Sequence, residues 1–286
     1  MEKYINKIQK GDALKKLKNR NIFPDESIDL IITSPPYADK RSDQYPTKTS
    51  KEYVHWFRKI SKQCHRILKP KGSFILNIKE HVKDYQRQPY TYNLVLDLIR
   101  TGWLWREEYC WYKKTAFPGS WPGRFRDTWE RVYHFSKQKD IEFFREPVQV
   151  PIGDWAKKRF NNDQVSNHDK KRHFSNTGSG LSRQVDNWQN KEYVDPHNVL
   201  ELVSVTNNTN HSAAFPVELP EWFIKLLTEE NDIVLDPFMG SGTTAIAALS
   251  NGRKYMGIEI ESKYVDIAEE RIKEENKKLD VRITDR

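Results

Sequence analysis

The sequence has little cysteine and no long hydrophobic run, and each shortage excludes a class of protein. Only two cysteines occur among its 286 residues, Cys64 and Cys110, which is too few for a disulfide framework or a four-cysteine zinc site. The histidines show no metal-ligand spacing, so we expect no bound metal. No apolar run approaches the roughly 18 residues of a membrane-spanning helix, and the start Met1-Glu2-Lys3 is no secretory signal. We therefore expect a soluble cytoplasmic protein.

Acidic residues are outnumbered by basic ones, 40 to 48, which gives a formal net charge of +8. An excess of positive charge favours a polyanionic partner such as nucleic acid. Charge does not decide the matter alone, because many basic proteins bind no nucleic acid. The length allows one large catalytic domain with an insertion, or two modest domains.

Apolar, β-branched runs alternate with segments of helical periodicity along much of the chain. The predicted strands are Tyr4–Gln9, Ile28–Ile32, Ser73–Ile78, Trp103–Tyr112, Arg131–Phe135, Ile233–Leu235 and Tyr255–Ile260. Helices are predicted to begin near Leu14, Thr49, Leu94, Pro220, Thr243 and Ser262. The second of these has a capping-box signature, Thr49 with Glu52, and is expected to end at Pro70-Lys71-Gly72. This alternation predicts an α/β fold with a doubly wound, mostly parallel sheet.

The tetrapeptide Ser34-Pro35-Pro36-Tyr37 follows a predicted strand, at the end where α/β sheets bind ligands. Consecutive prolines remove two backbone donors, so the carbonyls of Ser34 and Pro35 can face a substrate. The Ser34 hydroxyl and the Pro35 carbonyl suit the two hydrogens of a nucleobase amino group, and Tyr37 suits stacking on that base. Drawing the amine towards tetrahedral geometry would localise its lone pair for attack on a methyl group. On spacing alone, the same residues can equally be a turn that leaves a strand.

A second constellation lies near the other end of the chain, where Gly240 and Gly242 follow the strand that ends at Asp236. Glycines allow backbone to approach a ligand, and the next helix offers free N–H groups to a carboxylate. Glu259, 23 residues after Asp236, has the spacing of an acid that binds ribose hydroxyls. A phosphate loop is excluded, because Thr243 stands where its lysine would be. S-adenosylmethionine, a nucleoside with an anionic tail, fits this pattern, although an ordinary βα turn would look similar.

Both constellations resemble motifs of one family. Thr-Ser-Pro-Pro-Tyr at 33–37, after Asp29–Ile32, resembles the catalytic motif of the amino-group DNA methyltransferases. Its Ser-Pro-Pro-Tyr form is similar to the N4-cytosine branch, whereas the N6-adenine branch usually has Asp or Asn where Ser34 stands. Asp-Pro-Phe-Met-Gly-Ser-Gly-Thr-Thr at 236–244 resembles the cofactor motif, and Met256–Glu259 resembles the motif that follows it. The catalytic motif comes first, as in the circularly permuted beta group.

The resemblance implies a Rossmann-like methyltransferase fold in which the first strand lies beside the last ones. It implies that Asp12 contacts the adenine of the cofactor and that Phe215 lines the same pocket. It also implies that Tyr109–Lys137 lies near the flipped base, a segment that includes Trp111, Lys113, Arg124, Arg126 and Glu130. The cofactor-binding residues expected from motif and resemblance together are Asp12, Phe215, Asp236, Phe238, Gly240, Gly242, Thr243 and Glu259.

The resemblance ends between about residues 141 and 200, where the family places its target-recognition region. We therefore expect a catalytic half over 1–140, a target-recognition insertion over 141–205 and a cofactor-binding half over 206–286. The insertion carries basic residues suited to phosphate contacts: Lys157, Lys158, Arg159, Lys170, Lys171 and Arg172. The alternative is a solvated loop with a charged face.

The sequence thus predicts an S-adenosylmethionine-dependent enzyme that flips cytosine out of duplex DNA and methylates its N4 amino group by direct in-line attack. The resemblance implies the modification half of a prokaryotic or viral restriction-type system, with a cognate restriction endonuclease as a candidate partner. Three competing hypotheses stay open: N6-adenine methylation by the same loop, methylation of RNA, and a non-catalytic DNA-binding specificity subunit that keeps the fold.

Overall fold

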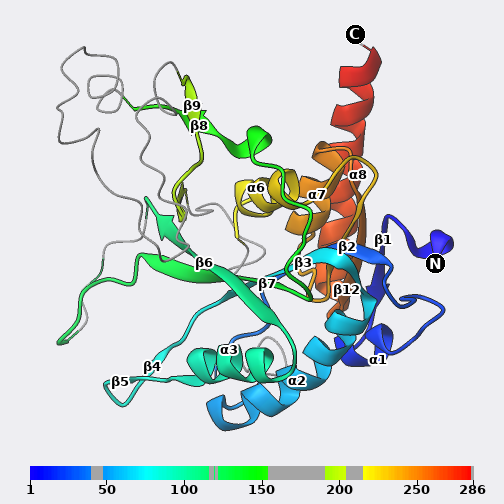
Figure 1. Cartoon of the computed structure of the whole chain (residues 1–286). Helices are drawn as coiled ribbons and strands as arrows, with labels where there is room; N and C mark the ends of the chain where they lie inside the picture. Colours follow the sequence, from blue (N-terminus) through cyan, green and yellow to red (C-terminus); the bar gives the residue numbers. More distant parts are fainter. Residues whose placement is uncertain (40–47, 116–118, 120–121, 154–190, 204–214, 285–286) are drawn as a thin grey trace, which may run out of the picture. The chain divides into compact units, whose positions relative to one another are not determined.

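A computed structural model of the chain describes residues 1–39, 48–115, 119, 122–153, 191–203 and 215–284 (Figure 1). The chain divides into two compact units, one made of residues 1–144 and 198–286 and the other of residues 145–197. Each unit is described by itself below.

The larger unit is built on one sheet of eight strands. Their order across the sheet is β1 (Lys7–Lys10), β12 (Lys254–Glu259), β11 (Ile233–Asp236), β2 (Ile28–Thr33), β3 (Leu68–Ile78), β7 (Trp129–Ser136), β6 (Leu104–Lys113) and β10 (Val199–Leu202). Neighbours run parallel except where β7 pairs with β3 and with β6. The predicted doubly wound, mostly parallel α/β sheet is confirmed.

The strand order brings the two ends of the chain together. β1 pairs in parallel with β12, with Ile8 opposite Gly257, so the first strand lies beside the last one, as the permuted arrangement requires. β11 pairs in parallel with β2, with Val234 opposite Leu30. The carboxyl ends of β2 and β11 therefore lie side by side at one edge of the sheet, which is where open α/β sheets bind ligands.

Helices cover both faces of this sheet (Figure 1). One face carries α1 (Ala13–Leu17), α2 (Ser50–Ile67) and α3 (Tyr90–Arg100), and the other carries α6 (Glu218–Leu227), α7 (Thr243–Ser250) and α8 (Ser262–Thr284). A short 3₁₀ turn, η1 (Glu2–Tyr4), precedes β1. No helix among the described residues is both long and apolar enough to cross a membrane.

Helix α2 shows how the sequence fixes an element. Its capping box is present, since the Thr49 side chain accepts from the Glu52 amide and Glu52 accepts from the Thr49 amide at 3.2 Å. Apolar residues at helical spacing, including Tyr53, Phe57 and Ile60, are buried in the core.

The predicted end of this helix is wrong. Helix α2 stops at Ile67, and Leu68 to Gly72 already belong to strand β3. The residue before a proline avoids helical geometry, so Pro70 favours an extended backbone in the residues that precede it, and the helix ends before the proline. The register of β2 on β3 shifts between Ile28 and Leu30. Gly72 permits this, because a Cβ there would lie 2.5 Å from the carbonyl oxygen of Asp29.

One hairpin was not predicted. Strands β4 (Val82–Lys83) and β5 (Gln86–Arg87) pair antiparallel beyond the end of β3. The two turn residues, Asp84 and Tyr85, have φ of 49° and 60°, as a two-residue hairpin turn requires. A pair of non-glycine residues in this conformation gives little sequence signal.

The smaller unit contains η2 (Glu146–Val148) and two short antiparallel strands, β8 (Val150–Pro151) and β9 (Tyr193–Val194). Arg145 forms an ion pair with Asp195 within it. This unit lies inside the segment 141–205 that we predicted as a target-recognition insertion, and that role stays a prediction. The six basic residues expected to contact phosphate, Lys157, Lys158, Arg159, Lys170, Lys171 and Arg172, lie outside the described residues.

Candidate active site

The predicted catalytic loop leaves the carboxyl end of β2, and its tyrosine hydroxyl is anchored in a polar cluster. The Tyr37 hydroxyl lies 2.8 Å from Glu130 Oε2 and 3.2 Å from Asn77 Oδ1. The Ser34 hydroxyl lies 3.3 Å from the Tyr37 hydroxyl and donates to it. Pro35 is buried, while Ser34 and Pro36 are partly exposed. Tyr37 is therefore fixed at its far end, with Ser34 beside it.

Glu130 is the centre of that cluster. It is buried on β7, and its other oxygen, Oε1, lies 2.6 Å from the ammonium of Lys113 on β6. The same ammonium lies 4.5 Å from the centre of the Trp111 ring. Burial opposes ionisation of Glu130, but the charge and hydrogen bond of Lys113 outweigh it, so the pKa of this carboxyl lies below its ordinary value. Glu130 is thus a carboxylate at neutral pH.

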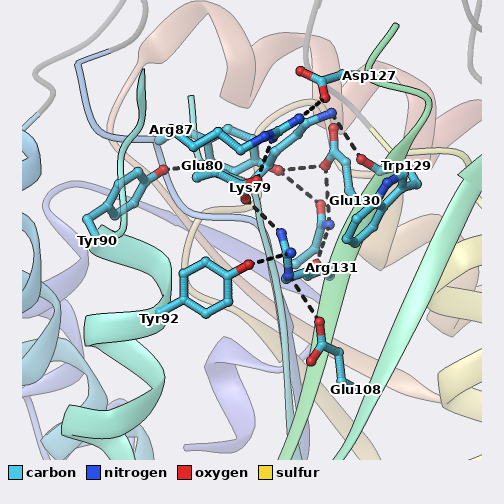
Figure 2. Close-up of polar contacts among 12 residues, drawn as sticks. Lys79, Glu80, Arg87, Tyr90, Tyr92, Glu108, Asp127, Trp129, Glu130 and Arg131 are labelled. Carbon is cyan, nitrogen blue, oxygen red and sulfur yellow. Dashed lines mark hydrogen bonds and ion pairs between the residues drawn. The ribbon is translucent and has the colours of Figure 1, made fainter. Parts of the chain in front are cut away.

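A second carboxylate braces the neighbouring strands. Glu80, buried just beyond the end of β3, pairs with Arg87 at 2.6 Å and with Arg131 at 2.8 Å. Arg131 reaches Glu108 as well, and Arg87 reaches Asp127 at 2.6 Å (Figure 2). These pairs tie the β4–β5 hairpin to β6 and β7, close to Glu130 but through different side chains (Figure 2).

A buried aspartate joins the catalytic loop, residues 34–37, to the glycine loop, residues 236–242. Asp236 Oδ1 accepts from the Thr33 hydroxyl at 2.7 Å, although the two residues are 203 positions apart in the sequence. Its other oxygen accepts from the Thr244 hydroxyl at 2.8 Å, and the Phe238 amide donates to Oδ1 at 2.9 Å. The residue directly before Ser34 is therefore bonded to the residue that begins the glycine loop.

The glycine loop is organised around Glu259 at the end of β12. Glu259 Oε2 accepts from the Gly240 amide at 2.8 Å, and Oε1 accepts from the amides of Ile260 and Glu261 at 2.9 Å. Burial raises the pKa of this carboxyl, and those backbone donors oppose the rise. A carboxylate has about four acceptor sites, so Glu259 keeps capacity for a ligand hydroxyl.

The loop ends where α7 begins, at Gly242, whose φ of 84° is left-handed. Arg271 on α8 stabilises this turn, because its guanidinium donates to the Ser241 carbonyl at 2.6 Å and to the Ser241 hydroxyl at 2.9 Å. The amides at the start of α7 are left with their partial positive charge.

The remaining expected cofactor residues lie at defined places in the same unit. Asp12 caps α1 through the Lys15 amide at 2.8 Å, and Gly11 before it donates to the Glu259 carbonyl at 2.8 Å. Phe238 lies 5.9 Å from the Trp56 ring. Phe215 and Thr243 are buried.

Of the residues expected near DNA, two are described. Lys113 is engaged by Glu130 and only 22% of its side chain is exposed, so it faces the polar cluster instead of the surface. Arg124 lies in the β6–β7 loop, 3.2 Å from Asp127. Within the described residues, no group of three or more His, Cys, Asp or Glu side chains could hold a metal ion.

Several site residues were missed from the sequence. Asn77 and Arg271 were not singled out, and Glu130 was named only as part of the segment that resembles a family hairpin. The one available signal was a carboxylate in β7, whose next five residues are all apolar, aromatic or basic. Nothing in the sequence shows that Glu130 meets Tyr37, because the two are 93 residues apart.

The buried Asp236 predicts how stability depends on pH. Burial raises its pKa to about 6, against the opposing hydrogen bonds from Thr33, Phe238 and Thr244. The Asp236 carboxyl therefore binds its proton more tightly in the folded chain than in the unfolded chain. Protonation of Asp236 stabilises the fold at low pH, and this stabilisation is lost as pH rises through about 6. As pH increases from 5 to 7, ionisation of Asp236 should lower the free energy of unfolding by about 1 kcal/mol.

Urea unfolding of the wild type and of Asp236→Asn at both pH values measures this effect. The amide keeps an oxygen for Thr33 but does not ionise, so the variant should lose that part of the pH dependence. An identical pH dependence in the two proteins would show that Asp236 is not the group responsible.

Known proteins are similar to this chain over most of its length. Residues 28–270 match the N6/N4 family described as DNA methylase. The type II methyltransferase M.BglII of Bacillus subtilis is 32% identical, over 93% of this chain and 69% of that protein. M.PvuII of Proteus hauseri is 31% identical, over 89% of this chain and 80% of that protein. The DNA adenine methyltransferase YhdJ of Escherichia coli strain K12 is 29% identical, over 92% of this chain and 81% of that protein.

Solved structures are also similar. That of PvuII DNA methyltransferase, described as cytosine-N4-specific, matches with a TM-score of 0.67 at 26% identity, covering 94% of this chain and 90% of that chain. A complex of M1.HpyAVI with S-adenosylmethionine matches in fold with a TM-score of 0.57 at 21% identity, covering 93% and 98%. The adjoining catalytic and glycine loops, the extent of the family match and the identity to M.BglII lead to one conclusion: this chain belongs to the N6/N4 family of DNA amino-methyltransferases.

Proposed function

We propose that the chain is an S-adenosylmethionine-dependent DNA methyltransferase that modifies the N4 amino group of cytosine. The observation that carries the proposal is the 2.7 Å bond from Thr33 to Asp236, because it holds the catalytic loop against the glycine loop. The choice of cytosine rests on Ser34, and on the similarity to a structure described as cytosine-N4-specific. The similar M1.HpyAVI structure contains S-adenosylmethionine.

The glycine loop fits that cofactor. Gly240 and Gly242 leave the backbone open to a ligand, Glu259 keeps acceptor capacity for ribose hydroxyls, and the start of α7 suits a carboxylate. Asp12 and Phe215 are proposed to lie at its adenine, and Asp236, Phe238 and Thr243 to shape the loop around it. When bound, S-adenosylmethionine would supply an electrophilic methyl group.

The catalytic loop would receive the flipped base. Ser34 Oγ and the Pro35 carbonyl are proposed to accept the two N4 hydrogens, and the face of Tyr37 is proposed to stack on the ring. Pro36 keeps the loop rigid. Ser34 is a poor base, so we expect the proton to leave after methyl transfer. The main contribution of the protein is then to orient the reactants, an effect that can supply roughly 7–11 kcal/mol.

Duplex DNA is the proposed substrate. We propose Arg124, together with the lysines and arginines at 157–159 and 170–172, for contacts with phosphate. M.BglII and M.PvuII are named type II methyltransferases, and a cognate restriction endonuclease acting on the same site is proposed as a partner.

N6-adenine methylation is the second candidate, because YhdJ, a DNA adenine methyltransferase, is 29% identical over most of this chain. The same two acceptors would suit the N6 amino group of adenine. Methylation of RNA and DNA binding without catalysis are less favoured, because the matching family is described as DNA methylase and YhdJ is named a DNA adenine methyltransferase.

A transfer assay tests the proposal. The purified chain, incubated with methyl-labelled S-adenosylmethionine and either duplex DNA or RNA, should label only the DNA. Label in RNA alone would identify an RNA methyltransferase. DNA binding without any transfer, at saturating cofactor, would favour the non-catalytic subunit.

A further inference from the structure

The hydrogen bonds around Tyr37 have a direction that their chemistry fixes. Glu130, held ionised by Lys113 at 2.6 Å, can only accept. Asn77 donates its amide nitrogen to the Arg131 carbonyl at 3.1 Å and to Glu130 at 3.3 Å, so its amide oxygen faces Tyr37. The Tyr37 hydroxyl thus meets an acceptor on both sides and must donate.

The direction then passes to Ser34. Burial and the charge of Glu130 raise the pKa of Tyr37 well above its ordinary value, so the phenol keeps its proton. Glu130 at 2.8 Å and Asn77 at 3.2 Å can only accept the single proton of the phenol, so the phenol oxygen is left to accept the Ser34 proton across 3.3 Å. With its own proton directed to Tyr37, Ser34 can offer only lone pairs to anything else that contacts it.

We infer that Glu130 is a positioning residue that acts through the Tyr37 hydroxyl to make Ser34 an obligate hydrogen-bond acceptor. This inference rests on the proposed function, because it concerns the base that Ser34 contacts. An acceptor at Ser34 suits an amino group, which donates, and rejects a carbonyl, which does not. Ser34 would therefore favour bases with an exocyclic amine over thymine or uracil. Lys113 serves the same purpose by holding Glu130 ionised, and Asn77 does so by presenting its side-chain oxygen to the Tyr37 hydroxyl.

Glu130→Gln tests this with little change in shape. A glutamine can donate to Tyr37 as well as accept from it, so the hydroxyls of Tyr37 and Ser34 are no longer forced into one direction. The single-turnover rate of methyl transfer to DNA should fall roughly 10- to 100-fold, the range for a lost hydrogen bond to a charged group. The KM values for DNA and for S-adenosylmethionine should stay within a factor of about 2, since neither binding surface changes.

Glu80→Gln is the matched control. Glu80 is also a buried carboxylate with two cationic partners, and Figure 2 shows it in the same region, but it bonds Arg87 and Arg131 instead of Tyr37. Removing its charge should leave the transfer rate within a factor of about 3 of the wild type, consistent with no contact to the reacting groups. An equal loss in both variants would mean that any buried charge here matters, which would overturn the inference.

Tyr37→Phe keeps the inference testable even where Glu130→Gln fails to fold. It removes the hydroxyl that connects Glu130 to Ser34 and leaves the buried charge of Glu130 in place, and it should also slow methyl transfer. Adding Glu130→Gln to Tyr37→Phe should then slow transfer by no more than about 2-fold further, because both changes break one chain of bonds. Additive losses in the double variant, or a Tyr37→Phe variant as fast as the wild type, would overturn the role of Glu130. The proposed function would still stand in either case, provided that the wild-type protein transfers methyl groups to DNA. Absence of transfer by the wild type itself would overturn both.

Discussion

Ser34→Ala should lower the rate of methyl transfer to DNA by roughly 100-fold or more, the loss typical when one preorganised hydrogen-bond partner leaves an active site. The variant keeps the Pro35 carbonyl and the Tyr37 ring but loses the side-chain acceptor for the amino group. Fold and cofactor affinity should be unchanged, because Ser34 is partly exposed and bonds only the Tyr37 hydroxyl among the described contacts.

Ser27→Ala is the matched control for that variant. Ser27 comes just before β2, and its hydroxyl donates to the Pro24 carbonyl at 2.7 Å, at the opposite end of the strand from Ser34. Its transfer rate should equal that of the wild type. A Ser34→Ala enzyme as fast as Ser27→Ala would contradict the catalytic assignment.

Gly242→Ala should cause the largest loss of stability, roughly 2–4 kcal/mol, by adding backbone strain to overpacking. The residue has φ of +84°, and a Cβ there would lie 3.0 Å from the Cβ and 3.2 Å from the Cα of Ala268 on α8. Either α7 or α8 has to move, which would disturb the loop proposed to hold the cofactor. Thermal melting and calorimetric titration with S-adenosylmethionine should show a lower Tm together with weaker binding.

Gly252→Ala separates the two causes. Gly252 has a similar φ of +72°, but a Cβ there would meet nothing nearer than Glu230 Cγ at 3.7 Å. This variant should lose only the strain contribution, on the order of 1 kcal/mol, and should bind cofactor as the wild type does. Equal destabilisation in the two variants would show that contact with Ala268 contributes nothing.

The sequence predicted the parts of this molecule that depend on local pattern. The run Ile28–Ile32 was predicted as a buried strand and forms most of β2, and Thr49 with Glu52 marked the start of α2. Adjacency of the first and last strands followed from motif order and the family resemblance, and pairing of β1 with β12 confirms it. The error at the end of α2 was local as well, since Pro70 acts on the residues before it.

Contacts between distant side chains could not be predicted. The sequence shows Glu130 directly before the predicted strand Arg131–Phe135, but not that antiparallel pairing of β3 with β7 brings it to Asn77 and Tyr37. The same limit applied to Lys113, which was expected near the flipped base and is bound to Glu130. Burial and partners decide what a charged residue does, and both arise only when strands pair.

The base that receives the methyl group tests the account most directly. Duplex DNA methylated by the purified protein would be digested to nucleosides and analysed by mass spectrometry. The account predicts N4-methyldeoxycytidine, formed roughly 100-fold or more slowly when the Ser34→Ala variant replaces the wild type. N6-methyldeoxyadenosine in its place would contradict the choice of cytosine, and DNA without any modified base would contradict the joint site formed by the loops at Ser34 and Gly240.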